Sequence, residues 1–257
     1  MIRLLYRGAS ALQAQQHEVD NLAHDLANVN TPGYKQGRVE FADLLHRRIR
    51  EGGMPVDRTA QPGISLGTGA KVVALDKDFR QGALLATGRA LDVAISGKGF
   101  FRVRQNGQEF LTRNGRFHRT ENGELAIANG AVLRRRVRIP EQATGLQIAP
   151  DGTVGGFVDG EWTVFGRFDL VWVDNPAGLE ALGDGSYRET PNSGRMRVDR
   201  PGEDGLGTLQ AGYLEGSNVD LGETMTNLMV AQRTHQLNAR ALQTGDELWS
   251  LANDLRR

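Results

Sequence analysis

The sequence predicts an α+β protein in which long N- and C-terminal helices form a coiled-coil layer around an inserted, mostly antiparallel β domain. Apolar residues recur every seven positions near both ends of the 257-residue chain, as in helices that pack along other helices. In the middle the period changes to two, which is typical of half-buried strands. We therefore expect four parts, at residues 1–35, 36–70, 71–216 and 217–257.

The first part, residues 1–35, is predicted to be a helix that ends in a sharp turn. Its seven-residue repeat consists of Leu5, Leu12, Val19 and Leu26. So narrow an apolar stripe cannot stabilise a helix of this length alone, so the helix needs partners. Pro32 restricts the residue before it, and Gly33 permits a tight turn. We expect this signature turn to set the direction in which the chain leaves the helix; it comprises Asn28, Thr31, Pro32, Gly33 and Tyr34.

Residues 36–70 are predicted to be a connector made of a short helix and an extended segment. The helix is suggested by the spacing of Phe41, Leu44, Leu45 and Ile49. After it, residues 51–69 carry Gly52-Gly53, Pro55 and Pro62-Gly63 and have too few apolar residues to form a domain. We expect this stretch to be extended, or to become ordered between neighbouring subunits.

Residues 71–216 are predicted to be the β domain, with a barrel or sandwich shape. Leu91, Val93 and Ile95 alternate with Asp92 and Ala94. Turn pairs of the type that favours two-residue hairpins separate the apolar runs. These pairs are Asn106-Gly107, Asn114-Gly115, Asn122-Gly123, Asn129-Gly130, Asp151-Gly152 and Asp159-Gly160.

Residues 217–257 are predicted to be a second long helix, with Asp220 as its N-cap and Glu223 in the capping-box position. One apolar seam comprises Leu221, Leu228, His235, Leu242 and Trp249. A second stripe, on another face, comprises Val230, Leu237, Ala241, Leu248, Leu251 and Leu255. An ordinary helix hairpin within one chain explains one seam but not both. Copies of the same chain are the simplest source of the second partner.

Composition and charge argue against several classes of function. The formal net charge is zero, which removes the general electrostatic argument for nucleic acid or an anionic membrane. No apolar run reaches the roughly 20 residues that span a bilayer, and no apolar core of a cleaved secretory signal is present. One dense basic run, Arg134, Arg135, Arg136 and Arg138, lacks interleaved aromatic residues. We expect it to pair with acidic groups on the surface or between subunits, rather than to bind nucleic acid.

Catalytic and metal-binding patterns are weak. His17, Asp20 and His24 share a helical spacing but lack the His-Glu-x-x-His pattern, so a solvated polar face is the simpler interpretation. His235 lies in an apolar stripe and is interpreted as a packed residue. The Gly97-Lys98-Gly99 run lacks the spacing of a phosphate-binding loop. We therefore expect no catalytic residue, no cofactor and no metal.

Three motifs, in order along the chain, resemble those of a known family. The first runs from Leu26 to Lys35 (LANVNTPGYK), and the second from Leu91 to Phe101 (LDVAISGKGFF) with Thr112–Phe117 (TRNGRF) after it. The third runs from Gly212 to Asp220 (GYLEGSNVD) and leads to Ala231-Gln232-Arg233. Together they resemble the axial proteins of the bacterial flagellum, which form its rod and hook. Chain length and the segment Ile64–Gly69 are most similar to those of the distal-rod member.

The resemblance implies a structural subunit that polymerises helically with itself into the hollow drive shaft between motor and hook. The terminal helices would form an inner coiled-coil layer, in contact with other rod and hook subunits. Export by the flagellar type III apparatus, without a cleaved signal, would place the chain outside the cytoplasmic membrane. Other hypotheses remain open: a proximal-rod or hook subunit, a monomeric β-domain binding module with a terminal coiled coil, or a hydrolase with its site in the β domain.

Overall fold

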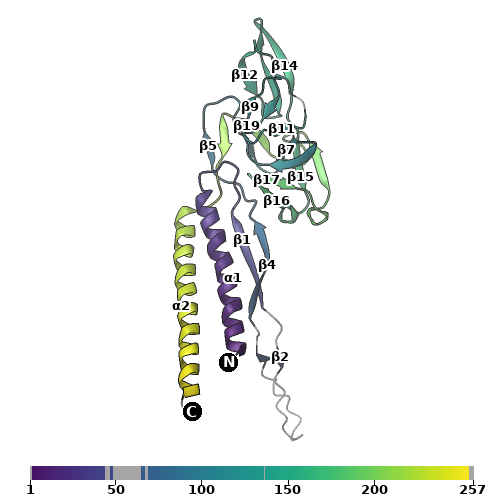
Figure 1. Ribbon diagram of the computed structural model, residues 1–257. Coiled ribbons are helices and arrows are strands. Elements are labelled where there is room, and N and C mark those ends of the chain that lie inside the picture. Colours follow the sequence, from purple (N-terminus) through teal and green to yellow (C-terminus); the bar gives the residue numbers. More distant parts are fainter. Residues whose placement is uncertain (1, 44–46, 49–64, 67–68, 136, 255–257) are drawn as a thin grey trace. The chain divides into compact units, whose positions relative to one another are not determined.

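The computed structural model describes residues 2–43, 47–48, 65–66, 69–135 and 137–254 (Figure 1). The chain folds into two compact units. The first, called here the helical unit, comprises Met1–Leu26, Gly37–Asp76 and Leu221–Arg257, and the second, the β unit, comprises Ala27–Gln36 and Lys77–Asp220. Predictions for Gly52-Gly53, Pro55 and Pro62-Gly63, and for the side chains of Leu5, Trp249, Leu251 and Leu255, lie outside the described residues.

The fold is α+β, with one helix near each end and antiparallel strands between them. The helical unit contains α1 (Ile2–Ala27), β1 (Gly37–Asp43), β2 (Arg47–Arg48), β3 (Ser65–Leu66), β4 (Ala70–Lys77) and α2 (Leu221–Asp254). The strands of the β unit are β5 (Leu84–Ala86), β6 (Val93–Ser96), β7 (Phe100–Gln105), β8 (Gln108–Thr112), β9 (His118–Arg119), β10 (Leu125–Ala126), β11 (Val132–Leu133), β12 (Thr144–Ile148), β13 (Thr153–Val158), β14 (Glu161–Arg167), β15 (Leu170–Val173), β16 (Glu180–Gly183), β17 (Ser186–Arg188), β18 (Met196–Asp199), β19 (Thr208–Ala211) and β20 (Tyr213–Glu215). Two short 3-10 helices cover Pro176–Gly178 and Pro191–Ser193.

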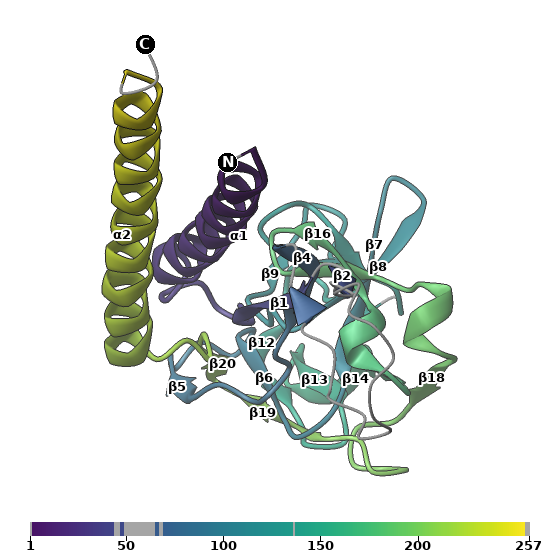
Figure 2. The same cartoon turned by 90° about the horizontal axis from the view of Figure 1, so that it is seen from below.

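In the helical unit, α1 and α2 lie side by side and run in opposite directions (Figures 1 and 2). A side chain at Gly8 of α1 would overlap the side chain of Leu242, so the two helices approach closely there. Glu223 lies in the first turn of α2, where the helix dipole favours a carboxylate. Within the described part of the chain, neither helix combines the length and hydropathy needed to cross a membrane.

The face that α1 buries is different from its seven-residue stripe. Among the side chains of α1 that the structure describes, the buried apolar ones are Ala14 and Leu22, whereas Leu12, Val19 and Leu26 are half-buried. Two polar residues of α1 hold the start of β1. Buried Asp25 accepts a hydrogen bond from the Gly37 N–H at 3.0 Å, and the Asn21 amide donates to the Gly37 carbonyl at 3.0 Å.

The connector differs from the predicted helix. Residues 37–43 form strand β1, which pairs with β4, so the helical interpretation of Phe41 is wrong. Apolar Val39 and Phe41 alternate with charged residues, and such alternation favours a strand once a partner strand is present. That partner, Ala70–Lys77, begins far along the sequence, and local spacing does not reveal it. The other residues of the predicted helix, Leu44, Leu45 and Ile49, lie outside the described residues.

The β unit is organised around strand β7. The main sheet has the order β16-β17-β8-β7-β11-β10-β9, and β15 joins it through antiparallel pairing with β7 and β18. Strands β12, β13 and β14 form a separate antiparallel sheet, while β6 pairs with β19 and β5 with β20. Phe101, Phe117 and Phe168 pack at the centre of the core, with ring centroids 5.2–5.8 Å apart.

Two of the predicted hairpin turns are confirmed directly. Asn106-Gly107 joins β7 to β8 and Asp159-Gly160 joins β13 to β14, and all four residues have positive φ. The prediction for Asn114-Gly115 is wrong, because Gly115 does not have a positive φ. A side chain at Gly115 would overlap the Val93 carbonyl, so this glycine permits two backbone segments to approach.

Candidate assembly site

Segments from all three sequence motifs meet at Glu215, the last residue of β20, within the β unit. The Lys35 ammonium lies 2.6 Å from Glu215 Oε1, and the Arg113 guanidinium lies 3.2 Å from Glu215 Oε2. The Gly82 N–H also donates to Oε1, at 3.0 Å. One carboxylate therefore joins the N-terminal motif, the central motif and the C-terminal motif.

This ion cluster is buried. The side chains of Lys35 and Glu215 are 0% exposed and that of Arg113 is 2% exposed. Burial lowers the pKa of Lys35 and of Arg113, and the nearby Glu215 carboxylate partly offsets this effect in both. Lys35 also donates to the Arg80 carbonyl at 2.7 Å, and Arg113 to the Gly97 carbonyl at 3.0 Å. Two cations and one anion leave the cluster with one net positive charge.

The signature turn is held against this cluster by backbone contacts. Gly33 has φ +72°, and its N–H donates to the Glu215 carbonyl at 2.8 Å. A Cβ at Gly33 would lie 2.7 Å from backbone atoms of Arg113 and Asn114. Glycine is therefore required here both for its conformation and for its size. Next to it, Tyr34 is buried beneath the Lys77 ammonium, which lies 4.7 Å from the ring centroid.

The other turn residues stabilise the turn itself. The Thr31 N–H donates to the Asn28 carbonyl at 3.0 Å, and the Thr31 hydroxyl lies 3.1 Å from the Asn28 side-chain oxygen. Pro32 is half-buried between Thr31 and Gly33. The structure thus places the five predicted turn residues in one ordered turn of the β unit.

Asn218 forms a second link between the motifs. Its side-chain oxygen accepts a hydrogen bond from the Gln36 N–H at 2.8 Å. Its amide nitrogen donates to the carbonyls of Asp78 and Arg80, at 2.8 and 3.2 Å. Burial opposes ionisation of Asp78, but hydrogen bonds from Arg80 outweigh it and hold the pKa of Asp78 below its ordinary value. The two links fix three chain segments that are far apart in sequence.

Sequence reasoning did not identify Lys35, Arg113, Glu215 or Asn218 as functional residues. Each stands inside a motif, but a charged residue in a polar motif ordinarily indicates a solvated surface. The useful signal would have been that Lys35 and Glu215 carry opposite charges and lie in two different motifs. Their separation of 180 residues hides the pairing from any local pattern.

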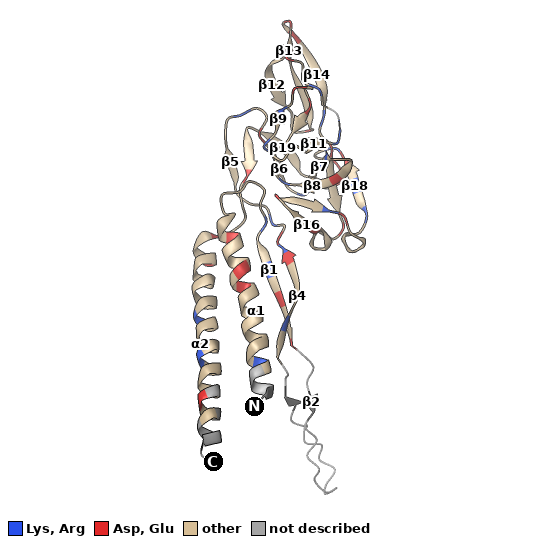
Figure 3. Ribbon diagram, in the orientation of Figure 1, with Lys and Arg blue, Asp and Glu red and all other residues tan. Residues whose placement is uncertain are grey.

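In the helical unit, α2 exposes much of its apolar surface. Val230 is 58% exposed, Leu237 64% and Leu248 60%, and Ala241 is also exposed. These residues belong to the predicted second stripe. Few charged residues interrupt α2, and most of it is tan in Figure 3. The described part of the chain therefore does not cover this stripe.

The first seam of α2 is partly covered. Leu228, His235 and Leu242 are half-buried, whereas Leu221 is 48% exposed. Two methionines beside this seam, Met225 and Met229, are also exposed. Exposed apolar side chains in such number on one helix indicate an interaction surface.

The described residues considered above for metal binding and for a basic surface lie at exposed positions. His17, Asp20 and His24 lie on the exposed side of α1. Among the described residues, no group of three or more His, Cys, Asp or Glu side chains is arranged to hold a metal ion. Arg134 and Arg135 lie in a bend after β11 and pair on the surface with Glu109 and Asp169 of the same chain. Arg136 lies outside the described residues.

Comparisons with known proteins agree with this arrangement. Three flagellar families match the chain: "Flagella basal body rod protein" at residues 5–35, "Flagellar hook protein FlgE/F/G D1 domain" at 94–156, and "Flagellar basal body rod FlgEFG protein C-terminal" at 210–255. The matches contain the signature turn, the main-sheet strands from β7 to β11, and Glu215 with α2. The chain therefore belongs to the flagellar basal-body rod protein family, whose members are structural proteins rather than enzymes.

Relatives that match the chain over its full length show which members of the family it resembles. The chain is 37% identical to the flagellar basal-body rod protein FlgG of Borreliella burgdorferi, over 100% of both chains. It is 36% identical to FlgG of Bacillus subtilis, again over 100% of both, and 34% identical to FlgG of Agrobacterium fabrum, over 98% of both. This chain is thus a structural rod subunit of the flagellar basal body, similar to FlgG along its whole length.

Proposed function

We propose that the chain assembles helically with copies of itself into the distal rod, the hollow shaft that transmits torque from the flagellar motor to the hook. In this assembly α1 and α2 form an inner coiled-coil layer. The observation that carries the proposal is the uncovered stripe of α2 at Val230, Leu237 and Leu248. Burying such a side chain contributes roughly 1.5–3 kcal/mol, so three of them supply a substantial part of one subunit contact.

The buried cluster at Glu215 supports a mechanical role. Torque must pass through each subunit without deforming it, which requires stiff connections between segments. Lys35 and Arg113 are held by one carboxylate in a fully buried site, and Gly33 adds a backbone hydrogen bond. Oppositely charged groups that are buried together resist displacement, because separating them leaves an unpaired charge out of water. The ion cluster is therefore the rigid base from which the signature turn extends.

The same proposal gives the chain its partners and its location. It contacts other rod and hook subunits at the ends of the polymer and lies in the basal body, outside the cytoplasmic membrane. The flagellar type III apparatus exports it unfolded and without cleavage of a signal. Membership of the rod family supports these proposed partners and this proposed location.

Sedimentation of the full chain at increasing concentration tests the assembly. The double variant Leu237→Ser, Leu248→Ser removes two exposed apolar side chains from the stripe. We expect the wild-type chain to form polymers that pellet, and the variant to need at least a tenfold higher concentration. Thermal unfolding of the dilute variant should be nearly unchanged, because both side chains already face water in the single chain.

A matched control changes two exposed polar residues of the same helix, Gln236→Ser and Gln243→Ser. It introduces the same serines, with the same small loss of helix propensity, and should assemble like the wild type. Equal assembly of the stripe variant and the control would contradict the proposed role of α2. A wild-type chain that stays monomeric at all concentrations would contradict the polymer itself.

A further inference from the structure

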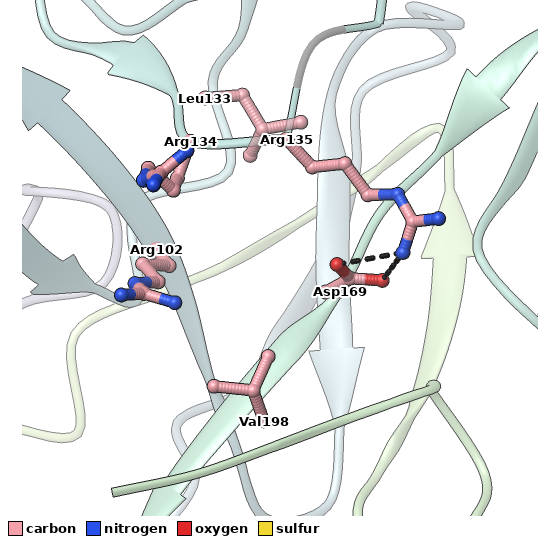
Figure 4. A pocket seen from close by; sticks show the side chains of 6 residues that line it. All are labelled: Arg102, Leu133, Arg134, Arg135, Asp169 and Val198. Atoms are coloured by element: carbon pink, nitrogen blue, oxygen red, sulfur yellow. Dashed lines mark hydrogen bonds and ion pairs between the residues drawn. The ribbon is translucent and has the colours of Figure 1, made fainter.

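The β unit carries a basic pocket that includes the surface ion pairs of Arg134 and Arg135. Its volume is about 230 Å³, and Figure 4 shows the side chains around it. The lining combines three guanidinium groups and one carboxylate with two aliphatic side chains: Arg102, Arg134, Arg135, Asp169, Leu133 and Val198. Val198 is 42% exposed, so part of the apolar wall also faces solvent.

The positive charge of this pocket is only partly neutralised. Arg102 and Arg134 share the Glu109 carboxylate, and Arg135 binds both oxygens of Asp169 at 2.6 and 2.8 Å. Three cations face two anions. Arg167 adds a fourth cation 4.0 Å from Asp169, and its Nε atom is buried without a hydrogen-bond partner. The cluster can therefore accept a further carboxylate.

A complementary surface lies at the tip of the β13–β14 hairpin. Asp159 and Glu161 are exposed there, and neither carboxylate has an ion pair in the part of the chain that the structure describes. Phe157 and Trp162 lie beside them, 42% and 47% exposed, with their rings in edge contact at 5.2 Å. The tip thus combines two free negative charges with an exposed aromatic pair.

The tip cannot reach the pocket of its own chain. Glu161 begins β14, and Asp169 follows the end of the same strand. Eight residues of extended chain separate them, which corresponds to roughly 26 Å at the rise of a β-strand. In Figure 1 the β12–β14 sheet occupies one end of the β unit, away from β7. Because the tip and the pocket of one chain lie apart, the acidic tip of one copy is complementary to the basic pocket of another.

We propose that the Asp159–Trp162 hairpin tip of one copy docks in the arginine pocket of a neighbouring copy. The tip carboxylates bind guanidinium groups of Arg134 and Arg135, while Trp162 packs on Val198 and the flat faces of the guanidiniums. This inference rests on the proposed polymer and names one of its outer contacts. A docked pair still presents one free tip and one free pocket, so the contact repeats along an open assembly.

The absence of cysteine from the chain permits a clean test by cross-linking. Glu161→Cys is introduced in one copy and Val198→Cys in another. The two are mixed, assembled and treated with a short bismaleimide. The control pair replaces Glu161→Cys by Asp184→Cys, which places the cysteine at another exposed acidic turn, between β16 and β17. We expect the tip pair to give at least fivefold more mixed dimer than the control pair.

A charge exchange tests whether the arginines cause the docking. Arg135→Glu in the copy that carries Val198→Cys should reduce the yield to that of the control pair. Asp159→Lys in the copy that carries Glu161→Cys should restore it. Both positions are exposed, but Arg135→Glu also breaks the Asp169 ion pair and Asp159→Lys places a lysine at positive φ, so thermal unfolding of each variant must show that it is folded at the assembly temperature.

The outcomes separate this contact from the polymer itself. If polymers pellet normally but tip and control pairs cross-link equally, the docking is wrong and the polymer stands. A yield that Arg135→Glu leaves unchanged also overturns the docking. If no polymer forms under any condition, the proposed function fails and the docking fails with it.

Discussion

Glu215 holds two buried cations, Lys35 and Arg113, with a single carboxylate. Replacing Lys35 by methionine leaves the Arg113–Glu215 pair intact and removes the net charge of the cluster. Replacing Glu215 by glutamine leaves two buried cations with no anion. Breaking a buried pair by removing one partner costs about 3–5 kcal/mol. We therefore expect Glu215→Gln to fall at the upper end of that range and Lys35→Met to cost less.

Urea unfolding of the two variants, followed by tryptophan fluorescence, measures these losses. The exposed pair Arg188–Glu180 provides the control, because surface pairs contribute only ~0–1 kcal/mol. Glu180→Gln should therefore change the free energy of unfolding little. If Lys35→Met destabilised the protein more than Glu215→Gln, the charge balance assigned to the cluster would be incorrect.

Comparing Gly33 with Gly88 separates the stability cost of a left-handed backbone conformation from the cost of overpacking. Both have φ near +70°, but a Cβ at Gly33 would meet the backbone of Arg113, whereas a Cβ at Gly88 would meet nothing within 4 Å. Gly88→Ala should cost about 1–2 kcal/mol from its left-handed conformation alone. Gly33→Ala should cost at least about 1 kcal/mol more, because overpacking adds to the same strain. Equal losses in urea unfolding would show that the turn relaxes away from Arg113.

The signature turn could be predicted from the sequence because proline and glycine restrict the backbone locally. Pro32 and Gly33 need no distant partner to define a turn. The ion cluster could not be predicted in this way, since Glu215 lies 180 residues from Lys35 in the sequence, at the end of a strand that pairs with β5. Burial of a charge is a property of the fold, and composition does not encode it.

At the scale of elements, α2 leaves much of its apolar surface uncovered. Arg233 and Arg240 are exposed on α2, beside the uncovered stripe. A helix that is covered on one side only opens locally at a lower free-energy cost than a fully packed element, so trypsin should cut dilute protein first at these arginines. Once polymers have formed, both sites should be protected at least tenfold. Mass spectrometry of the fragments over time checks this, and cleavage that is equally fast in polymer and monomer would argue against a covered helix.

Elements were predictable where a local pattern determines them. Both long helices, the antiparallel strands, and the turns at Asn106-Gly107 and Asp159-Gly160 follow from spacing and turn chemistry. Strand β1 was not predictable from its local pattern, because its pairing with β4 outweighs the helical spacing around Phe41. The seven-residue stripe of α1 is only half-buried in the single chain, while Ala14 and Leu22 are fully buried. Seven-residue spacing indicates which face needs a partner, but it does not tell whether that partner belongs to the same chain.

At the scale of the whole molecule, the single chain leaves apolar surface exposed on α2 and on strands β1 and β4 of the helical unit. Phe41, Val73 and Leu75 are each about half exposed or more, at 46%, 58% and 57%. In the proposed polymer, a subunit would gain its final stability from neighbouring copies, because obligate assemblies bury in their interfaces the apolar surface that a monomer leaves in water. The zero net charge of the chain also fits close packing of identical copies, since it avoids strong mutual repulsion.

Electron cryomicroscopy of the polymer formed by the full-length chain tests the central proposal most directly. The map should place Val230, Leu237 and Leu248 of each copy against helices of other copies, in an inner layer around a hollow axis. It should also retain the Lys35–Glu215–Arg113 cluster unchanged in every subunit. A map in which this stripe of α2 faces solvent, or is covered by its own chain, would contradict the proposed assembly.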